Sequence, residues 1–365
     1  MNEILIITEA GDIHAYAVAV ALQRKGAGPV VWHTSNFPSR AGYSISVEED
    51  ATLSVRDGAL DLAGRGFDVV WHRRPAAVLD EQALHPADLA YARDAVLELN
   101  IAALDFWPDA FWVNPRDHAL AASSKPRQQK LALEAGLRTP HTLYSNDPGR
   151  IRNFIRRHGG RVVFKTLADA RWSHEEKQYG VYTTPLTEEQ LVGDALLRNA
   201  PGIYQELVPK LFELRVTVIG DRLAAAKILS QETVTGRLDW RKAYAELRME
   251  PFELPAAIAA KTLALTRALG LVFGCVDFIV TPSGEYVFLE INQMGQFTFV
   301  EHYTGLPVTD MFAEMLLQGR PDFEWRESAA TARYADIHPI AEQMMFEAER
   351  TEVVRKVTPQ NERVA

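Results

Sequence analysis

The chain has 365 residues, of which 47% are hydrophobic and 24% charged, values typical of a globular protein with two or three domains. Its 39 basic and 48 acidic side chains give a net charge of −9, which argues against a nucleic-acid-binding protein, although a basic segment could still form a local patch. The single cysteine, Cys275, excludes a disulfide framework or a thiolate metal site within the chain.

Strand and helix patterns alternate with short connections over the first third of the chain. The sequence begins MNEILIITEAGD, which leads into a strand rather than a signal peptide, and no apolar stretch reaches bilayer-spanning length. We therefore expect a cytoplasmic protein with no membrane contact. Asp12 is placed to cap a helix that Gly26 ends. Strands are predicted at residues 4–8, 29–33, 43–55 (as a pair), 67–71 and 111–113, and helices at residues 13–25 and 87–104, which together indicate a small α/β domain.

The rest of the chain mixes helices and strands less regularly. Residues 167–178 are polar and are expected to be irregular. After about residue 324 the sequence is polar and weakly patterned, and we expect an exposed helix at residues 340–357. Helices are predicted at residues 125–135, 187–197 and 256–269, and strands at residues 161–166, 179–184, 203–207, 213–219 and 222–229.

The most informative stretch is FGCVDFIVTPSGEYVFLEINQMGQF, residues 273–297. Two apolar runs flank a Thr-Pro-Ser-Gly turn, which predicts a β-hairpin. Strand alternation places Glu290 and Asn292 on one face, and a turn centred on the Ser-Gly pair places Asp277 opposite Glu290. Two carboxylates and an amide oxygen on one face suit a magnesium ion that holds phosphates. The alternative is a solvated acidic face, but both faces of this strand are apolar until Glu290.

Two lysines are candidates for phosphate binding. Lys165 ends the predicted strand VVFK, where an ammonium group facing a cleft acts as a point charge. Lys125 opens a helix, whose free backbone N–H groups already favour anions. Each signal is weak alone, because most lysines are solvated. Neither lysine lies in a Walker-type loop and no Gly-x-Gly-x-x-Gly follows a strand, which disfavours P-loop and dinucleotide-binding sites.

Three further segments have a functional and a purely structural interpretation. The backbone of QELVP, residues 205–209, could pair with an adenine edge, or the segment is a plain edge strand. In the triplet DWR, residues 239–241, the arginine could bind a carboxylate or phosphate, or form a salt bridge with its neighbour. His72, Arg73 and Arg74 follow a strand of the first domain, where open α/β sheets bind ligands, or they form a solvated basic turn.

The order of these elements resembles the ATP-grasp ligase superfamily over roughly residues 110–320. The resemblance implies an α/β (α+β) protein with the ATP-grasp fold. It places an N-terminal pre-ATP-grasp α/β domain at residues 1–116. Two α+β subdomains that clamp ATP follow at residues 117–202 and 203–325, and a polar C-terminal tail occupies residues 326–365.

The resemblance also implies a nucleotide site. The helix SKPRQQKLALEAGLRTP and the strand VVFK match the two nucleotide-binding lysines at Lys125 and Lys165. YQELV is similar to the adenine linker, where the backbone of Glu206 and Val208 pairs with the base. Glu213, in the following ELR, is similar to the acidic residue near the ribose. Residues 167–178 match the loop that closes over phosphates, although this loop lacks glycine.

Metal and catalytic positions are implied in the same way. Asp277, Glu290 and Asn292 match the magnesium ligands of the family. Arg215 and Arg241 match basic positions that approach the phosphates or an acyl-phosphate. The residues expected to contribute to catalysis are Arg215, Arg241 and Lys165.

Three motifs narrow the resemblance to the microviridin or graspetide ligases, which macrocyclise ribosomally made peptides. These motifs are WHRRP, DWR and EINQMGQF. Bacterial ribosomal-protein glutamate ligases share the lysines, the linker and the metal pattern, but they typically differ after the final Asn. Substrate contacts are then expected from His72, Arg73, Arg74 and Asp239.

The resemblance implies an ATP-dependent ligase that uses one or two magnesium ions. An Asp or Glu side chain of a precursor peptide is activated as an acyl-phosphate, and a Thr or Ser hydroxyl or a Lys amine closes the ring as an ester or amide. The expected partner is the ribosomal precursor peptide, and homodimers are common in this superfamily. The alternative is an ATP-grasp ligase that adds a free amino acid to a peptide or small-molecule acceptor. A scaffold that has lost catalysis is disfavoured, because both lysines and all three metal ligands are present.

Overall fold

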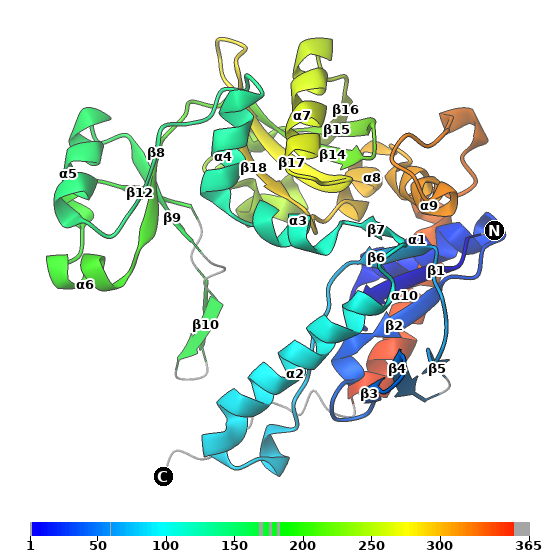
Figure 1. Cartoon of the computed structure of the whole chain (residues 1–365). Coiled ribbons are helices and arrows are strands. Elements are labelled where there is room, and N and C mark those ends of the chain that lie inside the picture. Colours follow the sequence, from blue (N-terminus) through cyan, green and yellow to red (C-terminus); the bar gives the residue numbers. More distant parts are fainter. Residues whose placement is uncertain (1, 59, 168–170, 175–176, 181–182, 354–365) are drawn as a thin grey trace.

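The computed structural model has the mixed α/β (α+β) organisation that the sequence predicts, with helices on the faces of several β-sheets (Figure 1). The structure describes residues 2–58, 60–167, 171–174, 177–180 and 183–353. Among these residues, no helix is long and apolar enough to span a membrane. Short 3-10 helices lie at Thr34–Asn36, Glu81–Ala83, Pro86–Asp88, Leu104–Phe106, Glu188–Gln190, Ser230–Glu232, Trp240–Glu246 and Glu327–Ala329.

The first unit is a parallel sheet in the strand order β2-β1-β6-β7. Strand β1 is apolar up to Thr8 and is buried throughout, as expected when both faces of a sheet are covered. Asp12 caps α1 as predicted, since its carboxylate accepts a hydrogen bond from His14 N at 3.2 Å. A small antiparallel sheet, β3-β4-β5, shares a core with this unit. The elements are β1 (Ile4–Thr8), α1 (Ile13–Arg24), β2 (Val30–His33), β3 (Gly42–Val47), β4 (Ala51–Asp57), β5 (Leu60–Asp61), β6 (Val69–His72), α2 (Leu89–Ala103) and β7 (Phe111–Val113).

The central unit is an antiparallel sheet in the order β12-β9-β13-β8. Helices α5 and α6 cover one face, where Ile151, Ile155 and Leu197 join Val162 and Tyr204 in one apolar cluster. The predicted helix at residues 187–197 is shorter than expected, because a 3-10 turn capped by Thr187 precedes α6. The elements are β8 (Thr142–Ser145), α5 (Pro148–Arg157), β9 (Val162–Thr166), β12 (Thr184–Leu186), α6 (Asp194–Asn199) and β13 (Gly202–Glu206).

The sequence predicts an irregular segment at residues 167–178, but residues 171–174 and 177–178 lie in β-strands. β10 (Arg171–His174) pairs with β11 (Lys177–Gly180), and the hairpin projects away from the central sheet in Figure 1. These strands are defined by backbone pairing. Their sequences lack the apolar pattern on which a strand prediction depends. The other residues of the predicted phosphate-closing loop, apart from Leu167, lie outside the described residues.

The last unit is an antiparallel sheet in the order β16-β15-β14-β17-β18. Helices α3, α4 and α7 lie on one face, and α8 and α9 contribute to the core on the other. The predicted hairpin register is confirmed, because Asp277 pairs with Glu290, with a β-bulge between Asp277 and Phe278. The elements are α3 (Arg116–Ala122), α4 (Lys125–Glu134), β14 (Phe212–Ile219), β15 (Arg222–Ile228), β16 (Met249–Phe252), α7 (Ala256–Ala268), β17 (Phe273–Val280), β18 (Tyr286–Asn292), α8 (Thr298–Thr304) and α9 (Val308–Gln318).

The C-terminal helix differs from the exposed helix that the sequence predicts at residues 340–357. Helix α10 (Tyr334–Val353) begins earlier and packs against α1, and Ile337 and Ala341 are fully buried. One apolar core runs from the first sheet through α1, α9 and α10 to the last sheet. The first and last units are therefore packed against each other through a shared core.

Candidate active site

The β17–β18 hairpin places the predicted metal ligands on one face of the last sheet. Asp277 and Glu290 are cross-strand partners, and Asn292 pairs with Cys275 two positions further along. Strand alternation therefore brings both carboxylates and the amide to the same face. The neighbouring strand β14 adds Arg215, whose register partner is Asp277.

Arg215 and Asp277 form an ion pair on this face. Nη1 of Arg215 donates to both carboxylate oxygens of Asp277, at 2.9 and 3.0 Å, while Nη2 donates to Gln296 O at 3.0 Å. Burial alone would lower the pKa of Arg215, but the Asp277 carboxylate outweighs it and raises the pKa. Burial raises the pKa of Asp277, and Arg215 opposes that shift. Arg215 is thus a fixed cation beside the metal ligands.

Two ammonium groups converge on the other carboxylate. Nζ of Lys125, at the start of α4, lies 2.6 Å from Oε2 of Glu290. Enclosure alone would raise the pKa of Glu290, but Lys125 and then Lys165 outweigh it and lower the pKa to about 2. Lys165, on β9, donates to Oε1 of Gln205 at 2.7 Å. Burial lowers the pKa of Lys165, and Glu290 opposes this effect. The two predicted nucleotide lysines come from different units: Lys125 contacts Glu290 directly, and Lys165 acts on it through its charge.

Gln128 fixes α4 against the hairpin. Its side chain is buried one turn after Lys125. The amide donates to Ile291 O at 2.8 Å and accepts from Ile291 N at 3.0 Å, and it also donates to Ala122 O at 2.7 Å. This reciprocal pair holds Lys125 beside Glu290. The sequence analysis missed Gln128, since a glutamine on a helix gives no signal of a partner 163 residues away.

The donor set fits magnesium. Within the described residues, no group of three His, Cys, Asp or Glu side chains could hold a metal ion. Asp277, Glu290 and Asn292 provide instead two carboxylates and an amide oxygen, which matches an ion that shares its coordination with substrate phosphates. Oδ1 of Asn292 accepts a hydrogen bond from Met294 N at 2.9 Å, which orients the amide and leaves a second lone pair on the oxygen.

The predicted adenine linker lies at the end of β13. The carboxylate of Glu206 lies 3.2 Å from Nδ1 of His141 and 3.8 Å from Nη2 of Arg138. The Glu206 N–H donates to His141 O at 2.9 Å, so it is already occupied. Val208 is buried, and its backbone N–H has no acceptor in the part of the chain that the structure describes. A free N–H at this point is compatible with pairing to an adenine edge.

Glu213, the predicted ribose contact, is paired within the protein. Nζ of Lys210 lies 2.9 Å from Oε1 of Glu213 and donates to Leu238 O at 2.9 Å. Burial raises the pKa of Glu213, and Lys210 opposes that shift. The sequence analysis missed Lys210, because a lysine three residues from an acid is common on protein surfaces, whereas this pair is almost fully buried.

The triplet at residues 239–241 contains a salt bridge. Nε and Nη2 of Arg241 donate to the two carboxylate oxygens of Asp239 at 2.8 and 2.6 Å. Asp239 is buried, whereas the Arg241 side chain is 56% exposed, so its guanidinium remains open to solvent on one side. Arg241 also lowers the pKa of both Glu290 and Lys165, which places its charge near the lysine–glutamate cluster.

The basic triplet at residues 72–74 is not a solvated turn, since His72 is the last residue of β6. Arg73 is fully buried, with Nε 3.1 Å from Oδ2 of Asp12, and its Nη1 donates to Met294 O. Arg74 is half-buried. His72 is also half-buried, and burial together with a nearby arginine lowers its pKa to about 4. Arg73 therefore connects the first unit to the segment that follows β18.

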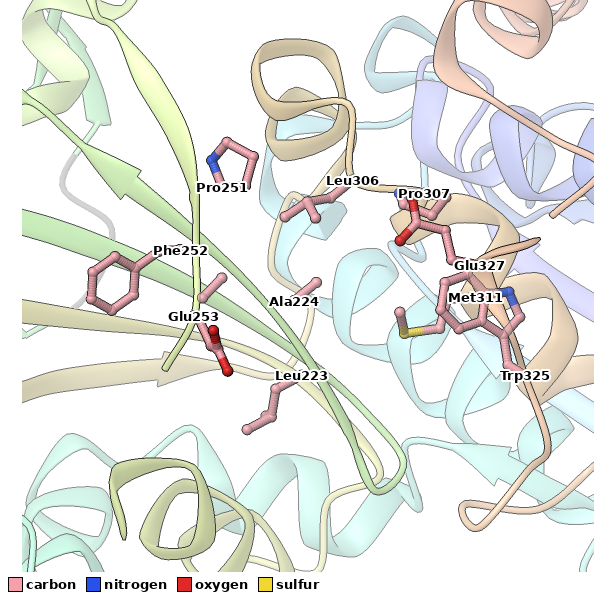
Figure 2. A pocket seen from close by; sticks show the side chains of 11 residues that line it. Leu223, Ala224, Pro251, Phe252, Glu253, Leu306, Pro307, Met311, Trp325 and Glu327 are labelled. Atoms are coloured by element: carbon pink, nitrogen blue, oxygen red, sulfur yellow. The ribbon is translucent and has the colours of Figure 1, made fainter. Parts of the chain in front are cut away.

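A separate cavity of about 480 Å³ lies between β15, β16 and the α8–α9 connection (Figure 2). Phe252, Leu306, Met311 and Trp325 give it an apolar lining, and Glu253 lies at its edge in Figure 2. None of the predicted site residues lines this cavity. The candidate active site is instead the face of β14, β17 and β18 that the two lysines approach.

The chain is similar in sequence and in structure to known ligases. No protein-family model matches the chain. A probable alpha-L-glutamate ligase of Xanthomonas oryzae pv. oryzae (strain MAFF 311018) is 26% identical over 213 residues, which cover 56% of this chain and 68% of the relative. A RiPP-associated ATP-grasp ligase of Chryseobacterium gregarium, solved with ADP and a leader and core peptide, has a TM-score of 0.80 and 25% identity, covering 89% of this chain and 100% of that chain.

Two macrocyclases of Microcystis aeruginosa MRC are similar over the same span. MdnC, solved with the precursor peptide MdnA, has a TM-score of 0.75 and 27% identity, covering 86% of this chain and 99% of that chain. MdnB has a TM-score of 0.71 and 28% identity, covering 87% of this chain and 99% of that chain. These similarities confirm the ATP-grasp fold and the resemblance to graspetide-type ligases that the sequence predicts.

Proposed function

We propose that this chain, an ATP-dependent ligase of the ATP-grasp superfamily, activates an Asp or Glu side chain of a ribosomally made precursor peptide and closes it onto a hydroxyl or amine of the same peptide. The product is a macrocyclic ester or amide, with ADP and phosphate. Support comes from similar structures solved with precursor peptides and from the geometry of the site.

The observation that supports this function most strongly is the convergence of opposite charges at the hairpin. Asp277 and Glu290 share one sheet face with Asn292, and each carboxylate is held by a cation from another element. We propose that this face binds one or two magnesium ions together with the triphosphate of ATP. Magnesium supplies charge neutralisation across the phosphates when it is bound.

The cations then have a defined task. A carboxylate is a poor electrophile until its oxygen receives the γ-phosphoryl group, whose bond to ADP breaks as the new P–O bond forms. Lys125, Lys165 and Arg215 lie where they can offset the charge on the transferring group. We assign Arg241, held by Asp239 with one side open, to the phosphates or the acyl-phosphate.

Ring closure needs little further chemistry. The hydroxyl or amine attacks the acyl carbon, loses its proton, and releases phosphate as the C–O(P) bond breaks. Because both groups belong to one bound peptide, the reaction is effectively unimolecular. We also propose that the adenine lies along Val208 and the carbonyl of Glu206, with Glu213 on the ribose side. In this assignment His72 and Arg74 belong to the substrate side of the site, whereas Arg73 is fully buried and paired with Asp12, so it does not reach the substrate itself.

A second candidate function has support from one relative. The similarity to a probable alpha-L-glutamate ligase favours transfer of a free amino acid onto a peptide or small-molecule acceptor. This reaction would use the same ATP, magnesium and lysine positions.

Mass spectrometry separates the two functions. The chain is incubated with Mg-ATP and a peptide encoded by a short neighbouring reading frame rich in Thr and Asp or Glu. We expect a product lighter by one water for each ring, with one ADP released per ring. A product heavier by one amino-acid residue in the presence of free amino acids would favour the second function, and the absence of ATP turnover with every peptide and amino acid would contradict both. We further propose a cytoplasmic location. We also propose a homodimer, which a measurement of molecular size in solution would test.

A further inference from the structure

A loop at residues 293–298, whose last residue begins α8, directly follows Asn292 and is held by the first unit of the chain. The strands β1, β6 and β7 are parallel, so the residues that follow them lie at one edge of their sheet. In open α/β sheets this edge commonly binds a ligand. Here its residues contact the 293–298 loop.

Asn114, which follows β7, fixes the start of the loop. Its Nδ2 donates to Gln293 O and to Phe273 O, both at 3.0 Å. Its Oδ1 accepts from Val272 N at 2.9 Å and from Phe273 N at 2.8 Å. The buried Asn114 amide thus joins the loop to the first residues of β17, the strand that carries Asp277.

His14 and Asp12, which follow β1, fix the end of the loop. Nε2 of His14 accepts a hydrogen bond from Phe297 N at 3.1 Å and lies 3.2 Å from Oγ1 of Thr298. Since Nε2 is an acceptor, the neutral ring carries its proton on Nδ1, which lies 3.2 Å from Oδ1 of Asp12. The other oxygen of Asp12 pairs with Arg73, whose Nη1 donates to Met294 O.

The same loop touches the active site on its other side. Met294 N donates to Oδ1 of Asn292 at 2.9 Å, and Gln296 O accepts from Nη2 of Arg215 at 3.0 Å. Except for Thr298, the loop residues that the first unit contacts are therefore hydrogen-bonded to Asn292 or Arg215 themselves, or are adjacent in the sequence to a residue that is.

We propose that Asp12, His14, Arg73 and Asn114 are positioning residues that set the orientation of Asn292 and Arg215 through the 293–298 loop. The first unit thereby helps to order the magnesium–nucleotide site without contacting the nucleotide through these four side chains. We base this on the proposed roles of Asn292 and Arg215, and not on the identity of the peptide.

The test compares His14→Ala with His14→Gln and with Lys25→Ala. Alanine removes the acceptor of Phe297 N–H, whereas glutamine can place an amide oxygen near the position of Nε2. Lys25 forms buried ion pairs with Asp310 and Glu314 away from the loop, so Lys25→Ala serves as a matched destabilised control. ADP affinity is measured by calorimetry over a series of Mg²⁺ concentrations, at a temperature where thermal unfolding curves show each variant to be folded.

We expect His14→Ala to weaken Mg-ADP binding about tenfold or more and to raise the Mg²⁺ concentration required, as for partners that orient metal ligands elsewhere. His14→Gln should recover part of the affinity, and Lys25→Ala should lose thermal stability but not affinity. Folded His14→Ala with wild-type Mg-ADP affinity and Mg²⁺ requirement would overturn the positioning role, as would an equal loss in Lys25→Ala. No peptide enters the assay, so failure of the macrocyclase function leaves this result interpretable.

Discussion

Three cationic residues of the site form ion pairs with carboxylates of the protein itself, without a bound phosphate. Lys125 is paired with Glu290, Arg215 with Asp277, and Arg241 with Asp239. Such pairing keeps each cation in place and offsets part of the cost of enclosing its charge. A triphosphate and a divalent ion can then exchange partners with groups that are already oriented.

Replacement of Glu290 by glutamine tests its role as a metal ligand. The change keeps the size of the side chain but removes the charge that Lys125 balances. We expect the variant to remain folded by circular dichroism while Mg²⁺-dependent ADP release falls by at least about 100-fold. Wild-type turnover would remove Glu290 from the site.

Lys165 should contribute directly to nucleotide affinity. A charge-assisted hydrogen bond to a phosphate is worth about 1.5–3 kcal/mol, so Lys165→Ala should weaken ATP binding about tenfold or more in a calorimetric titration. Lys130→Ala is the control, because the Lys130 side chain on α4 is 77% exposed and pairs only loosely with Glu134. Equal affinities in the Lys165 variant and the control would refute the assignment.

Glu301 should make stability depend on pH away from the active site. Burial raises its pKa from 4.5 to about 7, while Thr309 N donates to one carboxylate oxygen at 2.9 Å. A carboxyl group whose pKa is raised on folding stabilises the protein fully below pH 4.5, and this contribution is lost as the pH rises through 7.

The shift at Glu301 corresponds to about 3 kcal/mol of unfolding free energy. Glu301→Gln mimics the protonated side chain, so its unfolding free energy in urea should change less than that of the wild type between about pH 5 and pH 8. The same pH dependence in both proteins would show that Glu301 does not titrate in this range.

Among the secondary-structure elements, α10 is the one whose packing is hardest to predict from the sequence. Its sequence is polar overall, yet one face packs against α1. Ile337→Ala should destabilise the protein by about 2–5 kcal/mol in denaturant unfolding, because the side chain is fully buried. Ile340→Ala, on the same helix but 44% exposed, should cost much less. Equal effects would contradict the packing of α10 on α1.

The hairpin at residues 273–297 could be predicted in detail because its register depends on residues that are close together in the sequence. Period-two alternation and the turn sequence determine that Asp277 faces Glu290, and the structure has this register. By contrast, the sequence analysis predicted neither α5 nor β8. Strand β8 is half-buried along its length and gives little periodic signal. Helix α5 has an Asp147 cap and an apolar stripe of Ile151, Phe154 and Ile155, a local signal that the sequence analysis missed.

The candidate site was predictable only in part for a related reason. Lys125, Lys165 and the three hairpin ligands are marked by their positions at the ends of elements. His14, Asn114 and Gln128 act through partners more than 150 residues away in the sequence, and for His14 and Asn114 these partners belong to another unit. Their side chains carry no local mark of those contacts, and only the tertiary structure brings them to the site.

At the scale of the whole molecule, the first and last units behave as one block. They share a continuous core through α1, α9 and α10, and they are also joined by the polar contacts to the 293–298 loop. The central unit brings Lys165 and the adenine linker to this block from the other side (Figure 1). Nucleotide bound between this block and the central unit would contact residues of the central and last units.

A crystal structure with Mg²⁺ and a non-hydrolysable ATP analogue tests this account most directly. We predict that oxygens of Asp277, Glu290 and Asn292 surround the ion, with the triphosphate between Lys125 and Lys165. An analogue bound at saturating concentration elsewhere, or an ion that none of these three side chains approaches, would contradict it.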